Sequence, residues 1–215
     1  MYAFTDAFVG LLLDWGGNIG TPTRPNAFHA ALHSGYPGLT GANNELTGGS
    51  YARVAFTPER SGRILRNTAA IDFPAASSVW SEALFASFWS AASAGTCYGY
   101  APLGSAAARQ ASITDTTADL VEIAGHGFAD GDRVFLQQIA GIAVPTGLTK
   151  DTVYFVRDAT TDTFRLAATS GGTAIAISGA GAMTLQRITN ARTAQVGDVI
   201  RFAAGQLQFS LPAAA

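Results

Sequence analysis

The chain has 215 residues and a formal net charge of −2, a length that allows one large domain or two small ones. Hydrophobic residues make up 48% of the chain and charged residues 13%, against about 25% charged in ordinary soluble domains. This composition argues against a free cytosolic enzyme and favours a chain that buries surface against partners.

Neither a nucleic-acid partner nor a disulfide is expected. No basic run offers an electrostatic footprint for nucleic acid. Cys97 is the only cysteine, which excludes an intrachain disulfide, and its apolar surroundings predict a small buried residue.

A helix is the first predicted element. Thr5 suits an N-cap and Asp6 suits the first turn. Apolar residues at helical spacing form one stripe, ended by Gly16-Gly17, namely Phe4, Phe8, Leu11, Leu12 and Trp15. We expect the stripe to pack on its own domain, and docking to a partner is the alternative. The apolar run 8–13 is too short to cross a bilayer and lacks a basic flank, so neither a membrane partner nor a signal peptide is expected.

Short alternating apolar runs between Gly, Pro and Asn predict an all-β fold, a β-sandwich or jelly roll, for most of the chain. The predicted strands are 28–34, 50–56, two within 64–73, 83–89, 96–101, 199–202 and 206–211. Alternation in the first places Leu32 inward and His29 and His33 outward. The run 83–89 is apolar throughout, which predicts a central strand covered on both faces. Gly205 is expected in a hairpin turn between the last two strands.

An interruption divides this pattern. The strand and turn at 98–103 find their continuation only at Ala191. Between them lie predicted strands 119–123, 133–136, 152–158, 163–167, 174–177 and 183–188, with a hairpin loop at 158–162. We therefore predict a discontinuous host domain, 1–104 with 191–215, interrupted by a small barrel-like all-β domain, 105–190. The ends of this insertion should lie close together, because a tolerated insertion requires it.

Several blocks of the chain resemble virion proteins of tailed bacteriophages, described as head decoration, cement, minor tail or fibre-associated proteins. The host blocks are LHSGYPG (32–38), GANNELTGGSYAR (41–53), FPAA (73–76) before Trp80, and GDVIRFAAG (197–205). In the insertion, GHGF (125–128), GDRV (131–134), VYFV (153–156) and DTFRL (162–166) resemble a small β module of phage tail and fibre proteins. The resemblance implies a non-enzymatic virion protein, with capsid decoration as the first reading and a minor tail or fibre-adaptor protein as the alternative.

The reactive and metal-ligating residue types do not occur at the spacing of any known catalytic or metal-binding motif. On a strand, His29 and His33 lie roughly 13 Å apart, too far to share a metal ion. Asp130-Gly131-Asp132 is a fragment of a calcium loop and is interpreted as turn chemistry. No nucleophile elbow, P-loop or dinucleotide motif occurs. We therefore predict no catalytic, cofactor-binding or metal-binding residue.

A cluster of six aromatic residues between positions 80 and 100 has two interpretations. They are Trp80, Phe85, Phe88, Trp89, Tyr98 and Tyr100. Such residues suit a sandwich core with interface anchors. The alternative is a glycan-stacking platform, which would make the protein a glycan-binding module.

The polar loop 35–49 is the predicted interaction surface, because long Gly- and Asn-rich loops order on a partner. The predicted interface residues are Tyr36, Pro37, Asn43, Asn44, Glu45, Tyr51 and Arg53, with the last two facing solvent. From the resemblance, the expected partners are the major capsid protein or tail and vertex proteins, further copies of the chain as a dimer or trimer, and a host-surface glycan. We expect the protein on the outer head surface or the tail of the virion, after synthesis in the cytoplasm of the bacterial host.

Overall fold

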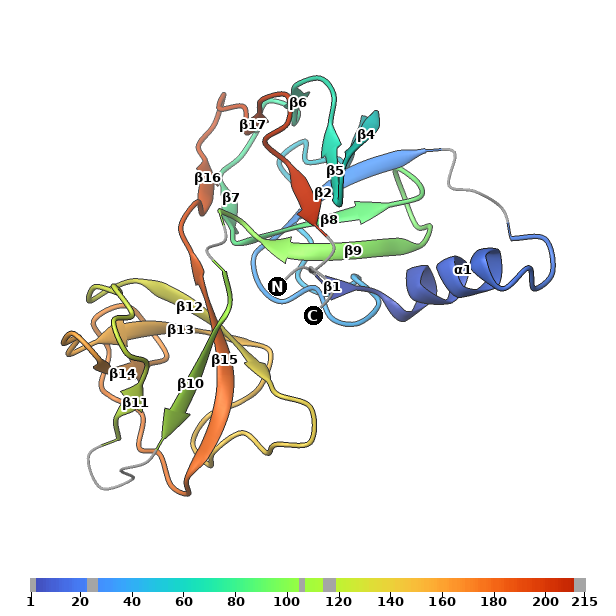
Figure 1. Ribbon diagram of the computed structural model, residues 1–215. Coiled ribbons are helices and arrows are strands. Elements are labelled where there is room, and N and C mark those ends of the chain that lie inside the picture. Colours follow the sequence, from blue (N-terminus) through green and yellow to red (C-terminus); the bar gives the residue numbers. More distant parts are fainter. Residues whose placement is uncertain (1–2, 23–26, 105–106, 114–118, 211–215) are drawn as a thin grey trace. The chain divides into compact units, whose positions relative to one another are not determined.

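The computed structural model describes residues 3–22, 27–104, 107–113 and 119–210. The chain divides into two compact units, Tyr2–Leu103 with Ala191–Ala215 and Gly104–Asn190. We call them the host unit and the inserted unit (Figure 1). Among the described residues both consist of strands, with one helix in the host unit, so the predicted all-β fold class is confirmed.

A five-stranded antiparallel sheet forms the first layer of the host unit. Its strands, in spatial order, are β1 (Ala3–Phe4), β9 (Cys97–Pro102), β8 (Phe85–Trp89), β2 (Phe28–His33) and β3 (Val54–Phe56). All five residues of the central strand β8 are buried, as its unbroken apolar run predicts. Its predicted neighbour along the chain is β9, which pairs with it.

Three small sheets form a second layer over one face of this sheet. They are β18 (Gln208–Ser210), β5 (Ile64–Asn67) and β4 (Pro58–Ser61); β17 (Arg201–Phe202) and β6 (Ile71–Asp72); and β16 (Arg192–Ala194) and β7 (Trp80–Ala83). Apolar side chains of both layers share one core, including Leu32, Phe88 and Tyr98 from the first layer with Phe73, Phe202 and Phe209. The host unit is therefore a sandwich, as the alternation predicts.

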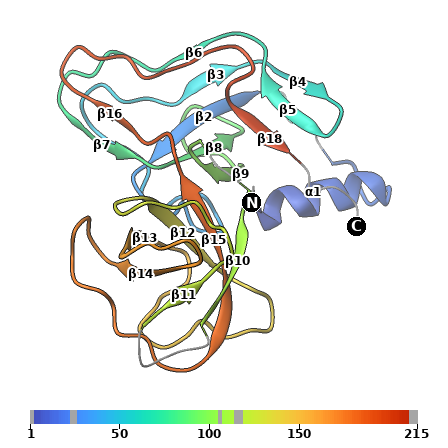
Figure 2. The same cartoon turned by 60° about the vertical axis from the view of Figure 1, so that its left-hand side comes forward.

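The segment that follows the insertion completes the second layer. β16 pairs with β7, β17 with β6 and β18 with β5, and Figure 2 shows β18, in red, beside β5. Gly205 makes the expected turn, with φ +73°. The predicted hairpin is wrong, because the strands on either side of this turn pair with different partners. The buried Asn67 holds the turn instead, donating to the Ala203 carbonyl and accepting the Leu207 N–H.

The helix α1 (Asp6–Gly16) begins as predicted. Thr5 is its N-cap and accepts the Phe8 N–H, while its hydroxyl donates to the Cys97 carbonyl of β9 at 2.5 Å. The Phe8 ring lies 5.2 Å from that of Tyr98. Beyond this first turn the helix buries none of its residues. The expectation that the apolar stripe packs on its own domain is met in part: Phe4, Phe8 and Leu11 are half-buried, whereas Leu12 and Trp15 are 42% and 59% exposed.

The inserted unit is a closed barrel, as predicted. Its strands, in order around the barrel, are β10 (Arg109–Ile113), β11 (Val121–Glu122), β14 (Thr163–Ala167), β13 (Thr152–Arg157), β12 (Arg133–Gln138) and β15 (Gly181–Ile188), which pairs with β10. Apolar side chains such as Phe164, Met183 and Leu185 fill its interior, as in other small barrels. β10 is a strand that the sequence did not predict, and the expected strand 174–177 is only an isolated bridge at Ala174.

The two ends of the inserted unit lie side by side. The Thr189 hydroxyl donates to the Gly104 carbonyl. Gly104 has φ +66°, and a β-carbon on it would lie 2.3 Å from that of Asn190. A glycine is thus required where the chain enters the barrel next to its own exit.

Candidate functional site

The polar loop 35–49 is an ordered part of the host unit. The Leu46 N–H donates to the Leu32 carbonyl at 2.9 Å, and the Asn43 N–H donates to the Pro37 carbonyl at 2.9 Å. Gly41 comes so close to the sheet that a β-carbon there would lie 2.3 Å from Cys97 Sγ. The expectation that this loop orders poorly without a partner is wrong, because its own unit supplies the contacts.

The loop covers the face of the sheet that sequence alternation places outward. Ala31, Trp89 and Cys97 form a buried cluster on this face, and His33 is fully buried. The outward placement of His33 is therefore wrong as a statement about exposure. Alternation separates the two faces of a strand but does not say what covers each of them.

A directed chain of hydrogen bonds runs through this covered face. His33 Nδ1 lies 2.8 Å from the Asn43 carbonyl, so this nitrogen donates. In the neutral ring, Nε2 then accepts from the Ser87 hydroxyl at 2.6 Å. The Ser87 oxygen in turn accepts the Trp89 Nε1–H at 2.8 Å. Burial lowers the pKa of His33, so the Ser–His pair is a neutral structural tie.

Arg53 clamps two loops to the sheet. Its Nε and Nη2 donate to the two carboxylate oxygens of Glu45 at 2.8 and 2.7 Å, and its Nη1 donates to the Ala91 and Ala94 carbonyls. The guanidinium carbon lies 3.5 Å from the centre of the Trp89 ring. Only 9% of the Arg53 side chain is exposed, so the prediction that it faces solvent is wrong. A guanidinium group that pairs with a carboxylate and stacks on a ring in this way fixes the position of both partners.

An open cavity of about 580 Å³ lies beside the clamp. Four of the seven predicted interface residues line it, namely Asn44, Glu45, Tyr51 and Arg53. Tyr51 is only half-buried, but its oxygen accepts the Leu32 N–H at 2.8 Å and burial raises its pKa. The walls of this cavity are therefore held by bonds that also hold the fold.

The other three predicted interface residues do not line this cavity. Tyr36 meets Tyr100 edge-on, with ring centroids 5.4 Å apart, and its hydroxyl accepts that of Tyr100 at 3.1 Å. Pro37 and Asn43 hold each other through the main chain of the loop. The structure thus brings together one part of the predicted surface and uses the rest to shape the loop.

The residues considered for chemistry serve local structure. Among the described residues, no three His, Cys, Asp or Glu side chains gather where they would hold a metal ion. Asp132 accepts the Ala129 N–H within its own turn, as turn chemistry predicts, whereas Asp130 accepts the N–H of the distant Ala159. Cys97 is buried, as predicted, and burial raises its pKa to about 12.

The cluster of six aromatic residues lies in the interior of the host unit. All six residues are buried, which are Trp80, Phe85, Phe88, Trp89, Tyr98 and Tyr100. The core interpretation is confirmed and the glycan-platform interpretation is wrong for these residues, because buried rings have no face to offer a sugar.

Two surface features concern apolar exposure on the host unit, for which docking of the helix was the stated alternative, and a cavity that the sequence did not predict. Leu13 on α1 and Ile19 just after it are 66% and 63% exposed. In the inserted unit, an open cavity of about 600 Å³ lies between β10 and the segment that continues β11. The apolar character of α1 was visible in the sequence, but its exposure follows only from the packing of the sheet.

These features define an all-β protein whose buried networks hold loops and strands in place. No helix within the described ranges is long and apolar enough to cross a membrane. A family model described as Podophage GP4 fiber I protein gp80 matches residues 3–118. This is more than half of the chain, and the chain belongs to that family. No curated protein matches it.

The family fixes the class of protein at the level of a phage virion protein of fibre type. The resemblance to tailed-phage virion proteins is confirmed at that level. The family description names a fibre and not a capsid, so the match gives no support to the head-decoration reading and fits the tail or fibre alternative better.

Proposed function

We propose that the chain is a non-enzymatic structural component of a podophage fibre, which attaches through its host unit and displays its inserted unit. The observation that carries this proposal is the match of residues 3–118 to a family described as a fibre protein. The matched residues include α1, the loop 35–49 and all five strands of the first layer.

The non-enzymatic part of the proposal agrees with the state of the reactive side chains. Ser87 and His33 lie next to each other but both are fully buried, and their hydrogen bonds end on main-chain and indole groups. Burial holds Cys97 as a thiol by raising its pKa to about 12. A nucleophile needs access and an activated form, which these groups lack in this fold.

The surface around α1 is the part of the host unit that we propose meets an apolar surface of a neighbouring fibre subunit. Its exposed apolar residues are Val9, Leu12, Leu13, Trp15 and Ile19. The helix has 11 residues, and isolated helices shorter than about 12–15 residues are marginal in water. Several exposed large apolar residues gathered on one short helix and the residue after it favour an interaction site. Asp6 and Asp14 are the only charges on α1, so a basic rim on the partner would complement it.

The proposal is tested by the location and copy number of the protein on purified particles. Immunogold electron microscopy is expected to label the fibre or tail, and quantitative mass spectrometry is expected to find tens of copies or fewer, as the symmetry of a tail allows. Label over the whole head with hundreds of copies would overturn the fibre proposal and favour capsid decoration.

A further inference from the structure

His126 is the buried histidine of the inserted unit, with 6% of its surface exposed. Its ring contacts two phenylalanine rings, with centroid distances of 5.1 Å to Phe128 and 4.9 Å to Phe164. Phe164 belongs to the barrel core and Phe128 packs against that core. The imidazole therefore lies in apolar surroundings, where a positive charge is costly.

The hydrogen bonds of His126 fix its protonation state. The main-chain N–H of Phe128 donates to Nδ1 at 2.9 Å. A main-chain N–H cannot accept, so Nδ1 carries no proton, and the proton of the neutral ring is on Nε2. This Nε2 faces the Thr163 carbonyl at 3.4 Å. A protonated ring donates from both nitrogens, so it cannot keep the bond to Phe128.

The turn that carries His126 has room to change its path. Gly125 and Gly127 flank the histidine with φ +55° and +66°, and a β-carbon on either would meet no atom within 4 Å. Glycine adopts both signs of φ at low cost. Once the bond from Phe128 to the ring is broken, the turn can therefore move at these two positions.

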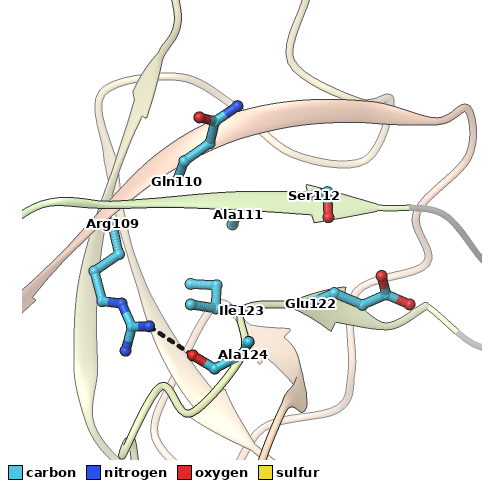
Figure 3. A pocket seen from close by; sticks show the side chains of 7 residues that line it. All are labelled: Arg109, Gln110, Ala111, Ser112, Glu122, Ile123 and Ala124. Atoms are coloured by element: carbon cyan, nitrogen blue, oxygen red, sulfur yellow. Dashed lines mark hydrogen bonds between the residues drawn. The ribbon is translucent and has the colours of Figure 1, made fainter.

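The same turn closes one end of a seam in the barrel. Arg109 of β10 donates to the Ala124 carbonyl at 2.6 Å and to the Gly125 carbonyl at 2.9 Å, and Figure 3 shows this side chain reaching across to Ala124. At the other end Ser112 of β10 pairs with Glu122 of β11. The open cavity of about 600 Å³ is lined by these two segments. The place of the turn thus decides whether Arg109 has its partners.

The charged groups packed around the turn act on the ring in opposite directions. They are Arg109 of β10, Glu122 of β11, Asp132, Asp162, Arg165 of β14 and Arg187 of β15. Asp162 accepts the Gly125 N–H, and Arg187 donates to the Gly127 carbonyl while it pairs with Asp132. Because both signs of charge surround the turn, the bond from Phe128 is what couples the ring to it.

We infer that His126 is a pH-sensitive latch of the inserted unit. With the ring neutral, the turn 124–128 is held and the seam between β10 and β11 is closed. Protonation of the ring breaks the bond from Phe128, the turn moves, Arg109 loses its two carbonyl partners and the seam opens. Opening uncovers Ala111 and Ile123, which belong to the barrel core.

The test is NMR of the isotope-labelled full chain between pH 8 and pH 5. We expect the amide shifts of 109–113 and 124–128 to change with the same midpoint as the ring signals of His126. The hydrogen-exchange protection of the Phe128 amide, corrected for the intrinsic effect of pH, is expected to fall about tenfold as its bond is lost. Amides shared by β12 and β13, which pair with each other, are the control and should keep their protection within about twofold.

His126→Asn is the matched variant. An asparagine side chain accepts the main-chain N–H two residues on and does not titrate in this range. The variant is therefore expected to keep the protection of the Phe128 amide at both ends of the pH range and to lose the pH dependence of the seam shifts. If this variant does not fold, the comparison of ring, turn and control amides in the parent chain still decides.

Four results would overturn the inference. The ring stays neutral down to pH 5, or it becomes protonated while the Phe128 amide and the seam do not change. The control amides lose protection together with the turn, which would mean that the whole barrel unfolds. The asparagine variant responds to pH as the parent does, which would assign the response to another group.

Discussion

Two buried side chains, Arg53 and His33, hold the loop 35–49 by different physical means. Arg53 carries a permanent charge that is compensated by Glu45 and by carbonyl oxygens. His33 is a neutral ring whose two nitrogens have opposite hydrogen-bond roles. The stability that Arg53 contributes depends on its partner Glu45, and the stability that His33 contributes depends on pH.

Replacing Arg53 is expected to destabilise the host unit strongly. Arg53→Ala leaves the carboxylate of Glu45 poorly compensated in a largely buried site, which lowers the free energy of unfolding by about 3 kcal/mol. Arg66→Ala is the matched control, because that arginine pairs with Glu59 while 41% and 45% of the two side chains are exposed. Its expected loss is about 0.5 kcal/mol. Urea denaturation measures both, and equal losses would contradict the clamp.

The host unit is expected to lose stability in mild acid through His33. Burial holds its folded-state pKa below the ordinary value of 6.5, and Arg53 lowers it further while Glu45 and the bond to Asn43 oppose this. The unfolded chain therefore binds more protons. The contribution of His33 is complete above pH 6.5 and is lost as the pH falls from there toward the lowered folded-state pKa.

Free energies of unfolding between pH 8 and pH 5 measure this loss. His33→Gln is expected to flatten the profile in part only, because the pKa of His29 is lowered too, by burial and by Arg53. An unchanged slope in the variant would contradict the role of His33.

At the scale of single residues, the sequence predicts which residue types lie near one another but not which elements bury them. Asn44, Glu45, Tyr51 and Arg53 are near one another in sequence and line one cavity, and their role at an interface stays a prediction. Their solvent exposure was mispredicted for Arg53, since its partners Ala91 and Ala94 belong to a turn that no local pattern links to it.

Among the elements, the loop 35–49 owes its path to a glycine under tight contact. Gly41→Ala is expected to lower the free energy of unfolding by about 3 kcal/mol, because φ is +77° and the new β-carbon would lie 2.3 Å from Cys97 Sγ. Gly48→Ala has a similar φ of +73° but open space, so it should cost about 1 kcal/mol. Thermal unfolding of both variants checks this, and equal losses would mean that the loop does not press on the sheet.

The exposed face of α1 is expected to matter for assembly and not for folding. Leu13→Ser changes a side chain that is 66% exposed, so its effect on the free energy of unfolding should stay within about 0.5 kcal/mol. Incorporation into particles is expected to fall severalfold. Val79→Ser alters an equally exposed host residue, at 61%, and should incorporate normally. Quantitative mass spectrometry of particles checks both, and normal incorporation of the Leu13 variant would contradict docking through α1.

The elements found from sequence are those with strong apolar patterns. β8, β9 and β12 to β15 were all predicted, because buried strands carry regular or continuous apolar residues. β4 and β10 were missed, since Pro-Glu-Arg-Ser and Arg-Gln-Ala-Ser-Ile have too few apolar residues to show a period. Their place as strands comes from their neighbours, β5 and β15.

On the scale of the whole molecule, the chain consists of a sandwich closed by its own last segment and a barrel with adjacent ends. Within the described ranges, β16, β17 and β18 pair with strands that precede the insertion. The barrel starts and ends at Gly104 and Asn190, whose main chains touch. We therefore propose that the host unit folds by itself when these two residues are joined directly, and that it is the part that attaches to the virion.

The copy number of this joined chain on particles tests that proposal most directly. The chain lacking 105–189 is supplied in place of the full chain, circular dichroism confirms that it folds, and mass spectrometry counts it on purified particles. We predict the same copy number as for the full chain. A joined chain that folds but is absent from particles would contradict the proposal, because attachment would then depend on the inserted unit.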